Sequence, residues 1–222
     1  LTVTTNDQGN TGSGGALSYT DNVAITSNAV NDAPVNTVPA AQTTNQDGTL
    51  TFSVANGNAI SVADVDAGSA NVQVTLTATN GVLTLAGTSG LTVTGNGTGT
   101  VTVTGSLTNI NTALNGLIFA PTANYNGAAN IQIVTNDQGN TGSGGAKSDT
   151  DNVAITVNAV NDAPVNTVPA AQTMNEDGTL TFSVANGNAI SVADVDAGGS
   201  NVQVTLTATN GVLTLAGTSG LT

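Results

Sequence analysis

The sequence predicts an all-β protein built from tandem antiparallel β-sandwich repeats of about 130 residues, each with one short helix. The first observation is that apolar and polar residues alternate with a period of two over many short segments, as in strands with one buried face. The second is that residues 1–92 align without a gap on residues 131–222 and differ at only 11 positions. About eight short strands per repeat favour two packed sheets over a barrel around a ligand.

Five segments show the alternation clearly, each bounded by Gly, Asn or Asp: Thr49–Val54, Val72–Thr79, Thr100–Thr104, Ile131–Thr135 and Val153–Val157. A sixth segment, 109–114, is instead typical of one or two helical turns, with Asn109 as the candidate N-cap and Gly116 just past the end. Aromatic residues are only 2% of the chain, so Val, Leu and Ile must supply most of the buried area.

The Asn-Asp-Ala-Pro strings at 31–34 and 161–164 predict the boundaries between repeats. On this basis, residues 1–34 are the C-terminal part of one repeat, 35–164 are one complete repeat, and 165–222 are the N-terminal part of the next. The sequence begins and ends within strand-like patterns, so we expect it to be a stretch of a longer array.

The composition excludes several classes of function. There are 14 acidic residues against one basic residue, Lys147, and there is no His or Cys. Histidine acid–base catalysis and thiolate chemistry are therefore excluded, and we expect no enzymatic activity. A formal net charge of −13 repels nucleic acid and anionic lipid, so we expect no nucleic-acid partner and no direct insertion into a membrane.

Most of the acid lies in four short strings that recur at the repeat period. They are residues 6–10, 30–34, 45–48 and 63–68, which recur as 136–140, 160–164, 175–178 and 193–198. An Asp-x-Asp string can direct two carboxylates at one ion, while Asn side chains and backbone carbonyls complete the oxygen ligands that Ca²⁺ prefers. The alternative is that Asp, Asn and Gly only form the turns between strands. Because charged residues are just 7% of the chain and most acids fall in these strings, we favour calcium.

Three stretches carry a resemblance to a known family. Residues 5–35 (TNDQGNTGSGGALSYTDNVAITSNAVNDAPV) resemble the end of a cadherin repeat and its linker, and residues 60–81 (ISVADVDAGSANVQVTLTATNG) resemble the cadherin segment with the Asp-x-Asp string. Residues 105–131 (GSLTNINTALNGLIFAPTANYNGAANI) are similar to the bacterial cadherin-like repeats of giant secreted adhesins.

This resemblance implies calcium at each junction between repeats, with neighbouring repeats of the same chain as partners. At the first junction it implies the ligands Asp7, Asn31, Asp32, Asp47, Asp64, Asp66 and Asn71. At the second it implies Asp137, Asn161, Asp162, Glu176, Asp177, Asp194, Asp196 and Asn201. Gln46 stands where the next copy has Glu176, so weaker binding is expected at the first junction.

The expected function is a calcium-stabilised structural repeat in the stalk of a secreted or cell-surface bacterial fibre or adhesin, serving adhesion or a biofilm matrix. One alternative is a subunit of a non-covalent extracellular filament, in which identical chains associate laterally or exchange strands. Another is a glycan-binding adhesin module. The near-identity of the copies speaks against the last, because a binding tip needs one specialised domain.

The segment 142–148 (GSGGAKS) superficially suggests a phosphate-binding loop. Ala146 precedes Lys147 where the motif needs Gly, and the preceding copy has Leu17 at the Lys position. We therefore expect a flexible Gly/Ser loop. The same Leu17 argues against a structural Lys–Asn isopeptide bond, because the neighbouring copy lacks the lysine.

Overall fold

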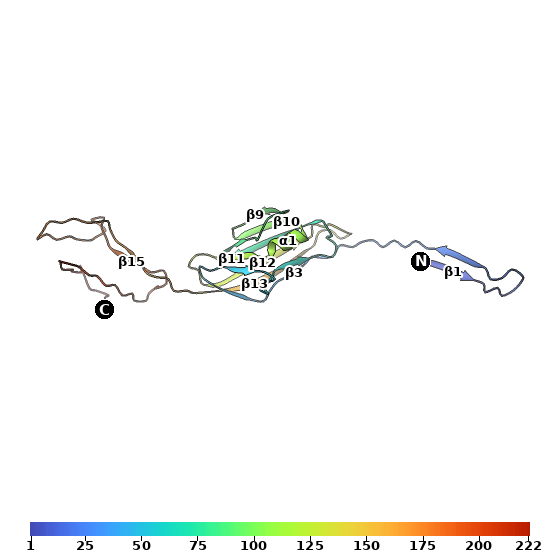
Figure 1. The fold of residues 1–222 in the computed structure, drawn as a ribbon, viewed down its shortest axis with the longest axis horizontal. Coiled ribbons are helices and arrows are strands. Elements are labelled where there is room, and N and C mark those ends of the chain that lie inside the picture. Colours follow the sequence, from blue (N-terminus) through green and yellow to red (C-terminus); the bar gives the residue numbers. More distant parts are fainter. The chain divides into compact units, whose positions relative to one another are not determined.

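The computed structural model describes residues 1–222, which divide into two compact units, Leu1–Ala159 and Val160–Thr222 (Figure 1). The structure is mostly β-strand with a single helix, α1 (Leu107–Leu114), which confirms the predicted all-β class. It contains no helix with the length and apolar character needed to cross a lipid bilayer.

The largest sheet of the first unit has six strands in the order β4–β13–β12–β7–β10–β9. Neighbouring strands are antiparallel except for β4 and β13, which run parallel. The bounds are β4 (Gln42–Asn45), β7 (Asn71–Thr79), β9 (Thr92–Thr94), β10 (Thr100–Ser106), β12 (Gly127–Asn136) and β13 (Ser148–Asn158).

A second, antiparallel sheet has three strands in the order β5–β11–β8. Its strands are β5 (Leu50–Phe52), β8 (Gly81–Thr84) and β11 (Leu117–Pro121). Two further short strands, β3 (Val35–Thr37) and β6 (Ser61–Ala63), pair antiparallel with each other.

Both sheets and α1 bury their apolar side chains in one core. Phe52 of β5, Leu76 of β7, Ile110 of α1 and Phe119 of β11 are all fully buried. Along β7 the side chains of Val72, Val74 and Leu76 are buried, and the residues between them are exposed or partly exposed. This is the alternation that the sequence predicted. Strands are confirmed in all five predicted segments, within β5, β7, β10, β12 and β13.

The helix begins two residues earlier than predicted. Its N-cap is Ser106, whose hydroxyl oxygen accepts a hydrogen bond from the backbone N–H of Asn109 at 3.4 Å. Asn109 lies inside the helix, and its side chain donates instead to the backbone oxygen of Gly90 at 3.2 Å. The candidate N-cap was therefore wrong, because Ser106 ends β10 in the extended conformation that an N-cap requires.

Identical sequences adopt different structures in different parts of the chain. Residues 201–209 repeat β7 letter for letter but form no strand, and Val204 is 51% exposed whereas its equivalent Val74 is fully buried. The neighbours of β7 are β10 and β12, and residues 160–222 contain no counterpart of either. Strand formation in this segment therefore depends on its partners.

The remaining strands form isolated pairs. In the second unit, β14 (Val165–Thr167) pairs with β15 (Ser191–Ala193), just as β3 pairs with β6. Near the N-terminus, β1 (Thr2–Asn6) and β2 (Ser18–Asn22) form a hairpin in the register of the corresponding part of β12 and β13.

We expect the Phe52→Ala substitution to lower the unfolding free energy of the first unit by about 3–5 kcal/mol, because it leaves a cavity in a fully packed site. Phe182→Ala, in the identical local sequence, should cost less than about 1 kcal/mol, because Phe182 is 43% exposed. Urea unfolding of the whole chain, followed by circular dichroism, measures both. Equal losses would contradict the assignment of the core.

Candidate functional site

The linker, defined as residues 29–34, lies against the loop that connects β12 to β13, residues 137–147. The backbone N–H of Asn31 donates to the oxygen of Ser143 at 2.9 Å, and the N–H of Ser143 donates to the oxygen of Ala29 at 3.0 Å. Val30 and Ser143 thus form a parallel bridge. The Gly/Ser loop is therefore hydrogen-bonded to the linker at Ser143, a contact that the sequence did not predict.

Gly142 is required by the close approach of the linker. Its φ is +94°, and a Cβ at this position would lie 2.6 Å from both the Asn31 nitrogen and the Val30 carbonyl carbon. The equivalent residue of the preceding copy, Gly12, has a similar φ of +101° but nothing within 4 Å of its Cβ position. Gly142 is therefore packed against another chain segment, and Gly12 is not.

Asn31 and Asp137 form a buried pair at the centre of this contact, each about 1% exposed. The Asn31 side-chain amide donates to Asp137 Oδ2 at 2.6 Å and to the backbone oxygen of Gly145 at 2.9 Å. The other carboxylate oxygen of Asp137 accepts hydrogen bonds from the backbone N–H groups of Gly139 and Lys147, both at 2.8 Å. Asp137 is thus fully hydrogen-bonded without a metal ion.

The pKa of Asp137 lies below its ordinary value. Burial alone would raise this pKa, because it disfavours the charged form. The hydrogen bonds from Lys147 N–H, Gly139 N–H and Asn31, together with the charge of Lys147, outweigh burial and favour the carboxylate. The Lys147 ammonium itself donates to the backbone oxygen of Asn31.

Asp66 also contacts the linker, and Asp64 is hydrogen-bonded to Asp66. Asp64 Oδ1 accepts hydrogen bonds from the N–H groups of Asp66 at 2.8 Å and Ala67 at 3.0 Å, whereas Asp64 Oδ2 is buried and has no hydrogen-bond partner. Asp66 Oδ2 accepts the backbone N–H of Asp32, which attaches the linker to this segment.

The β12–β13 loop contacts the same segment. The Thr141 hydroxyl donates to the backbone oxygen of Asp66, and the Asn140 side chain donates to the backbone oxygen of Asn71. The structure therefore brings together six of the predicted ligands, which we call the linker site: Asn31, Asp32, Asp64, Asp66, Asn71 and Asp137.

Two of the ligands assigned to the first junction, Asp7 and Asp47, do not belong to the linker site, and neither does Gln46, which was expected to weaken binding there. The carboxylate of Asp7 is hydrogen-bonded within its own hairpin, to the N–H groups of Gly9 at 2.9 Å and Leu17 at 2.8 Å. Asp47 accepts the N–H of Asn124 at 3.1 Å, and the N–H of the buried Gln46 donates to the oxygen of Asn158.

Asn158 is the last residue of β13, whereas the linker site lies beside the first. A strand of 11 residues is roughly 30 Å long, so Asp47 and Gln46 lie at the opposite end of the repeat from the linker site. The contacts therefore place Asp137 with the first linker, and they place Asp47 and Gln46 near the end of β13. The assignment of these residues as ligands, and the expected effect of Gln46, stay predictions.

The second unit repeats part of this arrangement. Asp194 Oδ1 accepts the N–H groups of Asp196 at 2.9 Å and Ala197 at 3.0 Å, and Asp196 Oδ2 accepts the N–H of Asp162. The side chain of Asn161 donates to the oxygen of Asp162 at 3.1 Å. The other three predicted ligands of this junction are Glu176, Asp177 and Asn201, and they take no part in these four hydrogen bonds.

Lys147 and the loop residues that contact the linker site were not predicted as part of it. The signal was present in the sequence, because Lys147 is the only basic residue and differs from its equivalent, Leu17. The contacts of Asn140 and Thr141 depend on how the loop folds back, which no local pattern of residues reveals.

The linker site offers carboxylate, amide and backbone oxygens, which are the ligands that a hard cation such as Ca²⁺ prefers. The buried, unpartnered Asp64 Oδ2 is an anionic oxygen that lacks a donor. In the structure as it stands, no group of three or more Asp or Glu side chains is close enough to hold a metal ion. Asp66 Oδ2 and Asp64 Oδ1 instead accept hydrogen bonds from backbone N–H groups.

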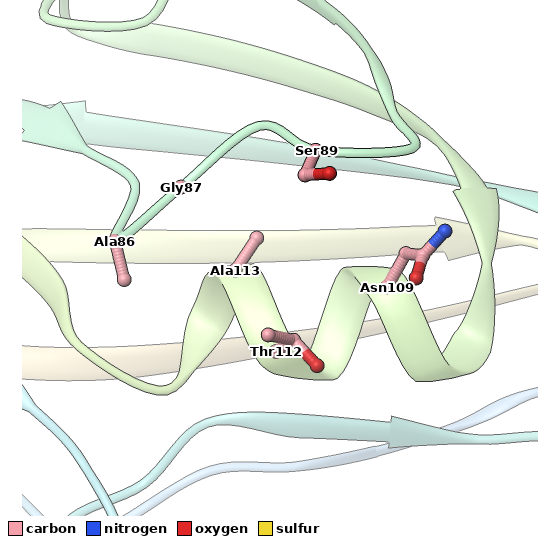
Figure 2. A pocket seen from close by; sticks show the side chains of 6 residues that line it. All are labelled: Ala86, Gly87, Ser89, Asn109, Thr112 and Ala113. Atoms are coloured by element: carbon pink, nitrogen blue, oxygen red, sulfur yellow. The ribbon is translucent and has the colours of Figure 1, made fainter.

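A shallow depression of about 350 Å³ lies elsewhere, between α1 and residues 86–89 (Figure 2). Its lining contains neither a charged nor an aromatic side chain: Ala86, Gly87, Ser89, Asn109, Thr112 and Ala113. Two of its polar groups are already engaged, because Asn109 donates to Gly90 and Thr112 donates to the oxygen of Thr108 at 2.8 Å.

We expect Gly142→Ala to destabilise the linker contact, because the new methyl group would collide with the linker backbone. Gly12→Ala is the matched control, since the positive φ is similar but the space is open. The rate of limited proteolysis within residues 23–34 should rise several-fold in Gly142→Ala and stay unchanged in Gly12→Ala. Equal rates in the two variants would contradict the close contact.

The lowered pKa of Asp137 predicts an acid-sensitive linker. A carboxyl whose folded pKa is depressed contributes stability above its unfolded pKa of about 3.9, and this contribution is lost as pH falls through the folded pKa. In calcium-free buffer, Asp137→Asn should lower stability near neutral pH by about 2 kcal/mol and flatten the decline below pH ~4. Thermal melts from pH 2 to 7 test this prediction.

Asp7→Asn is the control for the acid-sensitivity experiment. Asp7 also has a lowered pKa, caused by the hydrogen bonds from Leu17 and Gly9, but it is exposed and bound to no linker. Its substitution should leave the melting profile of the core close to that of the wild type. A profile of Asp137→Asn that matches that of Asp7→Asn would show that Asp137 does not support the linker.

In comparisons with known proteins, no protein-family model matches this chain and no curated protein matches it. The interpretation of the linker site therefore depends on its own contacts, burial and charge.

Proposed function

We propose that the chain is part of a tandem array of cadherin-like β-sandwich repeats, in which calcium bound at the linkers stiffens the stalk of a secreted or cell-surface fibre. The two sheets of the first unit share one core, as the two layers of a sandwich do. The linker at residues 29–34 is hydrogen-bonded to the folded part of this unit through its backbone and its side chains.

The observation that carries the proposal is the buried and unpartnered Asp64 Oδ2. A buried anionic oxygen without a donor is unfavourable by several kcal/mol in order of magnitude, so such groups are normally paired or bound to a metal ion. Asp66 lies two residues away and contacts the linker, and no basic side chain donates to either carboxylate. A divalent cation is the partner whose charge and ligand preference fit this place.

Asp64, Asp66 and Asp32 would hold the ion, assisted by amide and backbone oxygens of the linker site. When bound, calcium neutralises these carboxylates and joins residues on both sides of the linker. Asp32 belongs to the linker and Asp64 to the folded repeat, so binding favours the attached linker over the detached one. The stabilisation is RT ln(1 + [L]/Kd) for each independent site.

The repeated contact in the second unit supports the same proposal. Asp162, Asp194 and Asp196 reproduce the hydrogen bonds of Asp32, Asp64 and Asp66. This repetition occurs although most strands of the complete repeat have no counterpart in the second unit. The arrangement therefore needs only the two acidic strings and the strand pair between them, which is what a recurring ion site would use.

The glycan-binding alternative has less support. The depression beside α1 lacks the aromatic side chains on which sugar rings stack, and its hydrogen-bonding groups are partly used within the protein. A catalytic role has no candidate residues of its own in that depression.

The proposal is tested by calcium titration of the whole chain in an isothermal calorimeter. We expect the wild type to bind calcium, Asp64→Asn to lose one class of sites, and Asp64→Asn combined with Asp194→Asn to lose nearly all binding. Asp21→Asn is the control, because Asp21 lies in the exposed strand β2 outside the four strings. Absence of binding by the wild type at millimolar calcium would contradict the proposal.

A further inference from the structure

We infer that Lys147 is a built-in cation at the linker site, which secures the linker of this repeat without metal and competes with calcium there. The inference deepens the proposed function and rests on it for the competition with calcium. The structural effect of Lys147 on the linker can be measured independently of any metal.

The position of the Lys147 ammonium is the first observation. It donates to the backbone oxygen of Asn31, in the middle of the linker, and its charge helps to lower the pKa of the buried Asp137. The backbone N–H of the same residue donates to Asp137 Oδ1 at 2.8 Å. Lys147 therefore contacts the linker through its side chain and the linker's buried carboxylate partner through its backbone.

The second observation is the pattern of differences between the two copies. Lys147 and Asp149 replace Leu17 and Tyr19 of the preceding copy, so two of the 11 differences lie two residues apart at the start of β13. Asp149 Oδ2 accepts the backbone N–H of Asn36 at 2.7 Å, just after the linker. Both of the charged replacements thus contact the segment that enters the repeat, Lys147 at Asn31 and Asp149 at Asn36.

The two side chains give the linker contacts that an apolar pair cannot give. Leu and Tyr at these positions offer neither an ammonium donor for the Asn31 oxygen nor a carboxylate acceptor for the Asn36 N–H. A repeat of the Leu17 type would therefore depend more on an external cation to neutralise the carboxylates near its linker. A repeat of the Lys147 type carries one positive charge of its own.

The same charge opposes a second cation. The Lys147 ammonium contacts Asn31, and the next residue of the linker, Asp32, is hydrogen-bonded to Asp66. Like charges in a partly buried site repel, and salt screens this repulsion less than it does at an exposed surface. Removal of the ammonium should therefore strengthen calcium binding while it weakens the metal-free linker.

A covalent bond between Lys147 and Asn31 is the competing explanation of their contact. Such a bond would form by attack of the lysine nitrogen on the side-chain amide carbon, with release of ammonia. The ammonium instead contacts the backbone oxygen, and the side-chain amide of Asn31 donates intact to Asp137 and Gly145. The contact is therefore an electrostatic one between intact groups.

The test compares the wild type with Lys147→Met, which keeps the length of the side chain and removes its charge. Both are made in an Asp194→Asn background, so that calcium binding reports on the linker site of the complete repeat. In chelator, we expect Lys147→Met to lower the melting temperature by about 4 °C. In calorimetry, its Kd for calcium should fall about tenfold.

Leu17→Lys is the matched control, because residues 1–28 contain no linker equivalent to Asn31 that an ammonium at position 17 could reach. Its melting temperature and calcium affinity should equal those of its parent. Intact-mass measurement of the wild type should give the mass of the unmodified chain.

The outcomes separate the two proposals. An unchanged melting temperature of Lys147→Met in chelator, or a Kd for calcium that does not fall, would overturn the role of Lys147. A mass lower by one ammonia would overturn it in favour of a covalent bond. If neither protein binds calcium, the proposed function fails and so does the competition, whereas the melt in chelator still decides whether Lys147 secures the linker.

Discussion

The contact between Asn31 and Asp137 determines how a linker joins the repeat that follows it. Both side chains are buried, so water competes little for their hydrogen bond. Loss of either partner would leave a buried polar group unsatisfied, which is unfavourable. The pair fixes Asn31 on the β12–β13 loop, where the close approach of the linker backbone requires glycine at position 142. The attachment of the linker to this loop thus depends on one neutral amide that is bound to one carboxylate. The contact of Asp32 with Asp66 does not, because Asp162 and Asp196 make the same contact in the second unit, where Asn161 donates to Asp162 instead.

The strands could be predicted from the sequence because each has its own alternation of buried and exposed residues. The site was harder, because the order of acidic strings along the chain does not tell at which end of a strand each one lies. Asp47 and Asp64 are close in sequence, yet β4 places Asp47 beside Asn158, whereas Asp64 lies beside the linker. Asp137 is distant in sequence from Asn31 and touches it. Only the path of the chain through the sheets decides these pairings.

The repeated segments show how far local sequence determines structure in this protein. The Asp194–Ala197 turn forms in the second unit as Asp64–Ala67 does in the first, because its hydrogen bonds are made within a few residues. The strand at 71–79 needs β10 and β12 on either side, and the same residues at 201–209 are not a strand without them. The Asp-x-Asp turns of this chain therefore form from local sequence, whereas a strand such as β7 forms only when its partner strands are present.

The parallel pairing of β4 with β13 has a mechanical consequence. The chain enters the repeat through the linker ahead of β4 and leaves it at the end of β13, and these two strands are hydrogen-bonded side by side over residues 42–45 and 155–158. A pulling force at the two ends of the repeat acts in opposite directions along this pair, so it shears the strands instead of unzipping them. The hydrogen bonds between them then bear the load together, and they lie at the end of β13, where the chain leaves the repeat.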